Sequence, residues 1–253
     1  MVEVCALASG SNGNCYYVGN TTDAILVDAG ISCKQIIMRM EERGLSSSRL
    51  RAVFLTHEHA DHVRGARVLS KKLGIPVYYT YGTWNNAHKS SKAPFHAYIH
   101  IEEPLQLSSF TIHAFSKRHD ANEPCSYRIE HQGVNVGVMT DIGSVCENVA
   151  QHFGLCDAVF LETNYDEKML QDGAYPWFLK QRIASDVGHL SNNQALDLVR
   201  NHSNGRLKAV FLSHLSGENN TPELAYGTFI DYHNKIKVIK TSRHAASEIL
   251  NFE

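Results

Sequence analysis

Short apolar runs alternate with polar, turn-forming segments along the whole chain. Continuous apolar runs bounded by Gly, Ser or Asp are typical of strands that are buried on both faces. We expect such strands at residues 2–7, 15–18, 24–27, 52–55, 77–79 and 111–115. A hairpin is expected to join residues 126–130 to residues 134–139 around Gln132-Gly133, because a short polar pair that contains glycine between two apolar runs favours a tight turn.

Polar signatures mark the starts and ends of helices. Three Ser-x-x-Glu/Gln patterns predict capping boxes, and they are Ser32 with Gln35, Ser144 with Glu147, and Ser191 with Gln194. Thr221 followed by Pro222 is a fourth start, since the first helical position needs no N–H donor. Helix ends are expected at Gly44, Gly74 and Gly154. The helices predicted from these signals cover residues 33–43, 61–73, 145–153, 192–202 and 222–233.

The tetrapeptide Ala-Val-Phe-Leu occurs three times, at residues 52–55, 158–161 and 209–212. Each copy is followed at once by polar residues, so we expect three buried strands whose polar ends place chemistry at one edge of the sheets. Adjacent strands dominate the first half of the chain, and strands alternate with helices in the second half. This order predicts two sheets packed face to face with helices outside, in a single domain of residues 1–253.

Composition narrows the class of protein. Hydrophobic residues make up 43% of the 253 residues and charged residues 20%, which is typical of a globular protein. The net charge of −2 argues against electrostatic coating of a polyanion but allows a local basic patch. The six cysteines show no paired short spacing, which favours reduced thiols. Neither a signal segment nor a membrane-spanning run is visible, so we expect a cytoplasmic protein with no membrane partner.

Histidine is unusually frequent, and several of the 15 copies cluster just after the first Ala-Val-Phe-Leu run. The string there is His-Glu-His-Ala-Asp-His. Imidazole nitrogens and carboxylate oxygens suit zinc, manganese or iron, and a tight turn can direct several of them at one point. We expect His57, His59, Asp61 and His62 to bind metal, whereas Glu58 is expected to be a solvated charge.

This string resembles the second signature motif of the metallo-β-lactamase superfamily, and the other motifs follow in family order. Asp28 resembles the first motif, a structural aspartate beneath the metals, and His119, Asp141 and His214 resemble the third, fourth and fifth. The resemblance spans nearly the whole chain. It implies an α+β fold, specifically a four-layer αββα sandwich.

The resemblance also implies a dinuclear site that holds two divalent metal ions, with zinc or manganese favoured over iron. Asp141 would bridge the two ions. The first ion would be bound by His57, His59, His119 and Asp141, and the second by Asp61, His62, His214 and Asp141. Main-class β-lactamases have a cysteine where Asp141 stands, so antibiotic hydrolysis is disfavoured.

His189 is similar to the extra histidine that phosphodiesterase members, including tRNA 3′-processing enzymes, use near the leaving group. A cationic imidazole there could protonate a departing alkoxide, and Asp61 could orient it. We therefore expect Asp61 and His189 to be the catalytic residues. Only 21 residues separate His119 from Asp141, which leaves no room for the long arm with which many of these relatives bind tRNA.

The glycine-rich segment 8–15 and the segments 161–165 and 188–192 are most similar to the compact YycJ/WalJ/VicX branch of the superfamily. Members of that branch are regarded as DNA exonucleases or metal-dependent phosphodiesterases. The resemblance implies a metal-dependent hydrolase that cleaves phosphodiesters by a metal-bound hydroxide. Its expected substrate is nucleic acid, namely DNA cleaved from an end. The turn at residues 10–13 could receive a terminal phosphate.

Two other functions remain open. A glyoxalase II-like thioester hydrolase shares the histidine string and the bridging aspartate, but it does not need His189, and no basic cluster for glutathione carboxylates is visible. A non-catalytic redox module would favour iron and an attached flavin domain, which we do not expect here. The cationic residues expected to face a substrate are Lys117, Arg118, Lys180, Arg182 and Arg243.

Overall fold

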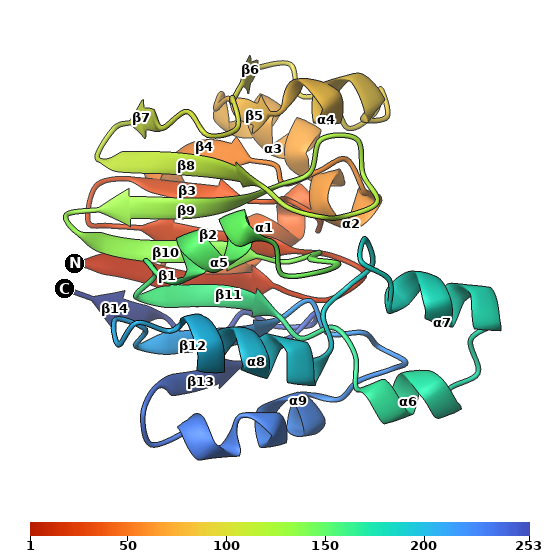
Figure 1. Ribbon diagram of the computed structural model, residues 1–253. Coiled ribbons are helices and arrows are strands. Elements are labelled where there is room, and N and C mark those ends of the chain that lie inside the picture. Colours follow the sequence, from red (N-terminus) through yellow and green to blue (C-terminus); the bar gives the residue numbers. More distant parts are fainter.

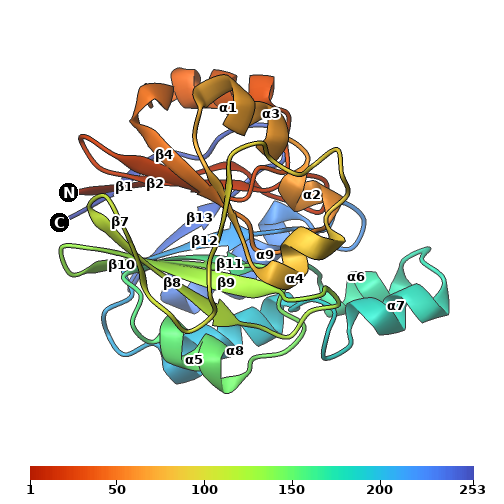
Figure 2. The same ribbon diagram turned by 90° about the horizontal axis from the view of Figure 1, so that it is seen from above.

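The computed structural model describes all residues from 1 to 253 and contains two mixed β-sheets that face each other (Figures 1 and 2). The first sheet has the strand order β14 (Leu250–Phe252), β1 (Val2–Ala8), β2 (Cys15–Gly19), β3 (Ala24–Val27), β4 (Leu50–Phe54), β5 (Val77–Tyr79) and β6 (His96–Tyr98). The second sheet has the order β13 (Lys237–Lys240), β12 (Ala209–Ser213), β11 (Ala158–Glu162), β10 (Val134–Met139), β9 (Cys125–His131), β8 (Phe110–Ser116) and β7 (Leu105–Leu107).

Helices cover the outer face of each sheet, which confirms the expected αββα order of layers (Figure 2). The helices on the side of the first sheet are α1 (Cys33–Glu42), α2 (Ala60–Val63), α3 (Ala66–Leu73) and α4 (Tyr81–Asn86). Those on the side of the second sheet are α5 (Glu147–Phe153), α8 (Asn192–His202) and α9 (Pro222–Thr228). The helices α6 (Glu167–Asp172) and α7 (Trp177–Ile183) form a hairpin that projects beyond the sheets. No helix combines the length and the apolar character needed to cross a membrane.

The repeated Ala-Val-Phe-Leu tetrapeptide lies in β11 and β12 and at the end of β4, whose last residue is Phe54, so the repeat predicted these three strands. Its alanines and phenylalanines belong to the core between the two sheets, whereas its valines and leucines belong to the cores under the helices. This alternation follows from the period of two along a strand. Each fully buried phenylalanine contributes roughly 1.5–3 kcal/mol. The phenylalanine rings of β11 and β12 lie 4.6 Å apart.

Most of the predicted helix signals are confirmed. Both Ser32 and Ser191 form full capping boxes, and Thr221 caps α9. The capping box at Ser144 is wrong, because α5 begins after Cys146 and the Ser144 hydroxyl donates to the Asp186 carbonyl instead, at 3.2 Å.

Two predicted helices are shorter than expected. The helix expected over residues 61–73 is broken at Gly65, whose N–H donates to the Ala29 carbonyl at 2.7 Å. A Cβ at Gly65 would lie 2.1 Å from the Ile31 carbonyl oxygen, so only glycine allows this close approach of two backbone segments. The helix expected over residues 222–233 ends at Thr228, and a 3-10 turn follows it.

The arrangement of strands determines where polar residues meet. The predicted hairpin is formed by β9 and β10, and its turn residues Gln132 and Gly133 have φ values of 51° and 83°, as a type I′ turn requires. Strands β10 to β13 are parallel to one another, and so are β3 to β6. The carboxyl ends of both parallel sets lie at the same edge of the sandwich, which is the right-hand edge in Figure 1. The polar residues that follow these strands therefore meet at this edge.

Candidate metal centre

The polar residues that follow the parallel strands are unusual in their backbone conformation. Asp28, Asp141 and His214 have φ values of 62°, 55° and 56°, and all three are buried. The left-handed region costs a non-glycine residue about 1–2 kcal/mol. Strain of this kind is typical of functional sites, where neighbouring structure holds a side chain in one required direction. The three strained residues therefore indicate a functional site at this edge of the sheets.

The first histidine cluster contains His57, His59 and His119, whose ligand atoms all lie within 4.8 Å of one another. The Nε2 atom of His57 is 3.0 Å from Nδ1 of His59. Burial lowers the pKa of His57 well below its ordinary value and lowers the pKa of His119 to about 4. These two imidazoles are therefore neutral near pH 7, which is the form that binds metal.

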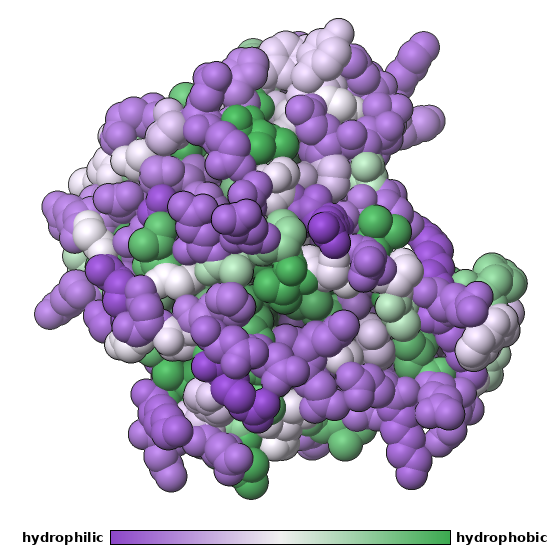
Figure 3. Space-filling model, in the orientation of Figure 1, coloured by the Kyte–Doolittle hydropathy of each residue, from purple (hydrophilic) through white to green (hydrophobic).

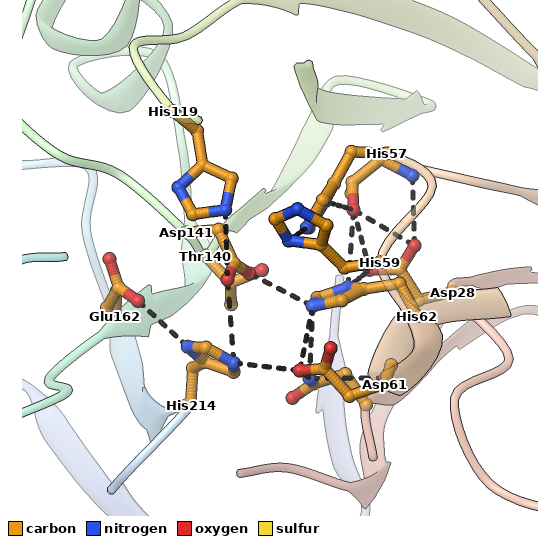
Figure 4. A network of polar contacts seen from close by, with 12 residues as sticks. Asp28, His57, His59, Asp61, His62, His119, Thr140, Asp141, Glu162 and His214 are labelled. Carbon is orange, nitrogen blue, oxygen red and sulfur yellow. Dashed lines mark hydrogen bonds and ion pairs between the residues drawn. The ribbon is translucent and has the colours of Figure 1, made fainter. Parts of the chain in front are cut away.

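The second cluster contains Asp61, His62 and His214 (Figure 4). The Nε2 atoms of His62 and His214 each lie 3.3 Å from Oδ2 of Asp61. Burial alone would lower the pKa of His62, but the carboxylates of Asp141, Asp28 and Asp61 outweigh it and hold the pKa well above its ordinary value. The three carboxylates thus favour positive charge at this buried cluster.

Asp141 lies between the two clusters, as Figure 4 shows. Its Oδ2 is 3.2 Å from His62 Nε2, and its Oδ1 is 3.5 Å from His214 Nε2 and 3.7 Å from His119 Nε2. Burial would raise the pKa of Asp141, yet the neighbouring imidazoles of His214 and His62 hold it well below its usual range. A single ionised carboxylate therefore faces both histidine clusters.

Asp28 supports the second cluster from beneath. Its Oδ2 lies 2.7 Å from Nδ1 of His62, and its carboxylate accepts hydrogen bonds from the Thr56 backbone N–H at 2.9 Å and from the Thr56 hydroxyl at 3.0 Å. A carboxylate on one ring nitrogen fixes the tautomer and leaves the other nitrogen for a ligand. Asp28 thereby directs Nε2 of His62 toward Asp61 and Asp141.

Glu162 was not expected in the site, yet the structure places it at the centre of a polar network. Its Oε1 lies 2.9 Å from Nδ1 of both His189 and His214, and its Oε2 accepts the backbone N–H groups of Ile142 at 2.7 Å and Leu190 at 3.1 Å. Burial would raise the pKa of Glu162, but the charge of His189 and the hydrogen bonds from the His189 and His214 rings lower it to about 2. The signal was present in the sequence, since Glu162 ends the second Ala-Val-Phe-Leu strand.

The network corrects two expectations. The carboxylate that orients His189 is Glu162 rather than Asp61, whose ring contacts are to His62 and His214. Glu58 is not simply solvated, because its Oε1 accepts a hydrogen bond of 3.0 Å from the backbone N–H of Asn122. That bond ties the histidine string to the loop that follows His119.

The donor set fits divalent metal ions. Imidazole nitrogens and carboxylate oxygens converge at three or four per group, and Nε2 of His119 is buried without a hydrogen-bond partner. An unpaired buried nitrogen beside other converging nitrogens and carboxylates is explained by an ion that accepts its lone pair. All seven residues expected as ligands are brought together here: His57, His59, Asp61, His62, His119, Asp141 and His214.

A cavity of about 350 Å³ opens beside this centre and shares His189 with it. Of the five cationic residues expected to face a substrate, Arg182 and Arg243 line this cavity. The other three do not line it, and they are Lys117, Arg118 and Lys180. The ammonium group of Lys117 is instead buried beneath the site, where it donates to the Thr140 carbonyl at 2.7 Å. Nδ1 of His189 is held by Glu162, so Nε2 is the nitrogen available to a molecule in the cavity.

Comparisons with known proteins agree with this geometry. The model of the β-lactamase superfamily domain matches residues 23–215. The exodeoxyribonuclease WalJ of Streptococcus pneumoniae is 37% identical over 231 residues, which cover 89% of this chain and 86% of WalJ. The exodeoxyribonuclease YycJ of Bacillus anthracis is 35% identical over 222 residues, which cover 87% of this chain and 84% of YycJ.

Solved structures with low sequence identity share the fold. The metallo-β-lactamase fold protein YhfI from Bacillus subtilis superimposes with a TM-score of 0.73 at 15% identity, covering 99% of this chain and 100% of YhfI. The short form of human tRNase Z superimposes with a TM-score of 0.68 at 14% identity, covering 99% of each chain.

Proposed function

The chain belongs to the β-lactamase superfamily and is a metal-dependent hydrolase, and on this basis we propose that it hydrolyses phosphodiester bonds of DNA from an end. The observation that carries the proposal is the position of His189. It is held by a buried carboxylate and lines a cavity, directly beside the histidine and aspartate clusters. A proton donor at that place suits a reaction whose leaving group is a poor one, such as the sugar oxygen of a phosphodiester.

We propose two divalent ions, zinc or manganese, that share Asp141. His57, His59 and His119 would complete the first site, and Asp61, His62 and His214 the second. When bound, the ions would neutralise charge on the phosphate and lower the pKa of a water molecule. Because these ligands come from strand ends of both sheets, we also propose that residues 1–253 act as one hydrolase domain.

The residues of the chain divide the remaining tasks. Glu162 holds Nδ1 of His189 at 2.9 Å, so the imidazole can present a proton from Nε2 to the leaving oxygen. Asp61 faces the rings of His62 and His214 and keeps negative charge beside them. The guanidinium of Arg243, anchored on the Leu215 carbonyl at 3.0 Å, provides further donors for phosphate oxygens in the cavity. The chain thus offers a proton donor and an anion site on the same side of the metal centre.

DNA is the proposed substrate because both curated relatives are named exodeoxyribonucleases and match most of the chain. The net charge of −2 means that binding must depend on a local patch, so affinity should fall with salt more gently than for a basic protein. We expect the turn at residues 10–13 to lie near a terminal phosphate, since Asn12 lines the cavity that also holds Arg243.

The decisive experiment offers the metal-reconstituted protein four substrates side by side. They are linear duplex DNA, covalently closed circular DNA, bis-p-nitrophenyl phosphate and S-lactoylglutathione. We expect linear DNA to be shortened and closed circles to remain intact. Equal cleavage of closed circles would disprove end recognition but keep the phosphodiesterase assignment. Efficient turnover of S-lactoylglutathione with no phosphodiester cleaved would establish the thioester hydrolase instead.

A further inference from the structure

The α6–α7 hairpin, residues 166–184, is inserted between β11 and α8 and projects past the edge at which the metal centre lies (Figures 1 and 2). Its base is tied to the site, because the His189 backbone N–H donates to the Ile183 carbonyl at 2.9 Å. Its inner side contributes Tyr175, Leu179 and Arg182 to the cavity beside His189. A molecule that occupies this cavity therefore lies against the hairpin.

The outer end of the hairpin carries two adjacent aromatic side chains that the protein leaves uncovered. Trp177 is 71% exposed and Phe178 is 73% exposed, more than any other large hydrophobic residue of the chain. Neither ring packs on another aromatic ring. Figure 3 shows apolar surface at the outer end of this projection. A single exposed hydrophobic residue is ordinary, but a neighbouring pair beside a substrate cavity indicates a binding surface.

The charge of α7 indicates what kind of molecule binds there. Its sequence, Trp-Phe-Leu-Lys-Gln-Arg-Ile, contains Lys180 and Arg182 and no carboxylate. The guanidinium of Arg182 pairs with Asp120, whereas the ammonium of Lys180 donates to the Gln171 carbonyl at 2.6 Å and has no carboxylate partner. Aromatic faces beside cationic groups are the combination that binds single-stranded nucleic acid, since every base has a face to stack and every linkage carries a negative charge.

The length of α7 agrees with this interpretation. Ile183 lies six positions after Trp177, which at about 1.5 Å per residue is roughly 9 Å of helix. Successive nucleotides of a strand rise about 3.4 Å each, so this distance corresponds to two or three nucleotides. The aromatic pair, which lies outside the lining of the cavity, thus stands a few nucleotides away from His189.

We infer that Trp177 and Phe178 form a stacking platform for unpaired bases of the nucleic-acid strand whose end lies at the metal centre. This inference rests on the proposed function and adds a strand-binding element to it. The platform holds bases that have left the duplex, while Lys180, three residues after Trp177 and without a carboxylate partner, lies beside the phosphate backbone. DNA with a frayed or single-stranded end should therefore bind better than DNA whose end is locked in a duplex.

The test uses the metal-loaded protein with both rings removed, Trp177→Ala/Phe178→Ala. Binding is measured with a fluorescent oligonucleotide whose phosphorothioate linkages resist cleavage. We expect the dissociation constant and the KM for DNA to rise about tenfold to a hundredfold. Hydrolysis of bis-p-nitrophenyl phosphate, which has no base to stack, should fall far less. The conservative variant Trp177→Phe/Phe178→Tyr keeps two rings and should restore tight binding.

The matched control removes two other exposed apolar side chains, Leu224→Ala/Ile230→Ala, which lie at α9 and the turn after it. This control should bind and degrade DNA as the parent protein does. Unchanged oligonucleotide binding by Trp177→Ala/Phe178→Ala would overturn the platform. So would a loss of dimers or of lipid-vesicle binding as the only effect, since these rings would then contact a second copy or a membrane. Oligonucleotide binding that depends on the rings, without any phosphodiester cleavage, would instead refute the proposed function alone.

Discussion

The two ends of the same strands are built on different physical principles. At the carboxyl ends, buried left-handed residues such as Asp28, Asp141 and His214 hold polar groups that face one another, and Nε2 of His119 has no hydrogen-bond partner. At the opposite ends, left-handed residues such as Ser108 and Gln132 lie in exposed turns, where strain has no other consequence. Backbone strain therefore accompanies a cluster of polar groups only at the carboxyl ends, where the strained residues are buried.

Charges at the opposite ends are paired in the ordinary way. Asp157 accepts the Asn135 backbone N–H at 2.9 Å and pairs with Arg206 at 3.0 Å, and Arg51 pairs with Asp23 at 2.6 Å. Both of these carboxylates are thus neutralised by cations, and Asp157 is also 3.7 Å from the ammonium of Lys208. The comparison shows that one edge of the sandwich pairs its charges as a stable fold requires, whereas the other brings together imidazoles and carboxylates in a set that fits a metal ion. Substitutions made separately at each edge test that difference.

The largest effect is expected from removing the shared carboxylate. Asp141→Ala should release metal and abolish activity together, because Asp141 faces both histidine clusters. Elemental analysis and DNA cleavage measure the two losses. The matched control is Asp157→Ala at the opposite edge, which should lower the melting temperature by a few degrees through the loss of its hydrogen bonds while metal and activity remain. Metal content that survives in Asp141→Ala would refute the shared-carboxylate arrangement.

Removing the proposed proton donor should separate metal binding from catalysis. His189→Ala is expected to keep its metal yet cleave DNA about a hundredfold to ten-thousandfold more slowly. The loss should be much smaller on bis-p-nitrophenyl phosphate, whose leaving group departs without protonation. Steady-state rates on both substrates, with metal content measured in parallel, test this. An emptied site in His189→Ala would make His189 a ligand rather than an acid.

Metal removal should lower the stability of the parent protein but not that of the Asp141→Ala variant. An ion present at a thousand times its dissociation constant stabilises the folded state by about 4 kcal/mol. For a chain of this size, chelation should therefore lower the melting temperature by roughly 10 °C. Thermal unfolding with and without chelator measures the shift. Asp141→Ala should show little further change on chelation, and an equal shift in both proteins would place the stabilising ion elsewhere.

The smallest effect is expected at the opposite edge, where the backbone strain of a left-handed residue can be relieved without loss of activity. Gln132→Asn should stabilise the β9–β10 turn by about 0.5–1 kcal/mol, because asparagine tolerates the left-handed region better than glutamine. Melting temperature should rise by about 1–4 °C, with unchanged DNA cleavage. A change in activity would mean that the β9–β10 turn and the metal centre are coupled.

Much of this arrangement could be predicted from local patterns. The Ala-Val-Phe-Leu strands, the caps at Ser32 and Ser191 and the type I′ turn depend on residues that are neighbours in sequence, so a short window contains their physical cause. The seven expected ligands lie within one short string or directly after strands whose carboxyl ends meet at one edge. Parallel pairing then brings them together, as the order of motifs implied.

Other features depended on contacts between distant segments. Glu162 lies 27 residues from His189 and 52 residues from His214, and only the packing of β11 between β10 and β12 brings the three together. The break of the expected 61–73 helix at Gly65 likewise follows from the Ile31 backbone, which no local pattern reveals. The α6–α7 hairpin was missed because its helices are short and its rings face solvent, so no apolar periodicity marks it. The sequence alone therefore determined which groups could do chemistry, whereas tertiary structure decided which carboxylate orients which imidazole and which aromatic rings stay exposed, because those outcomes depend on distances through space.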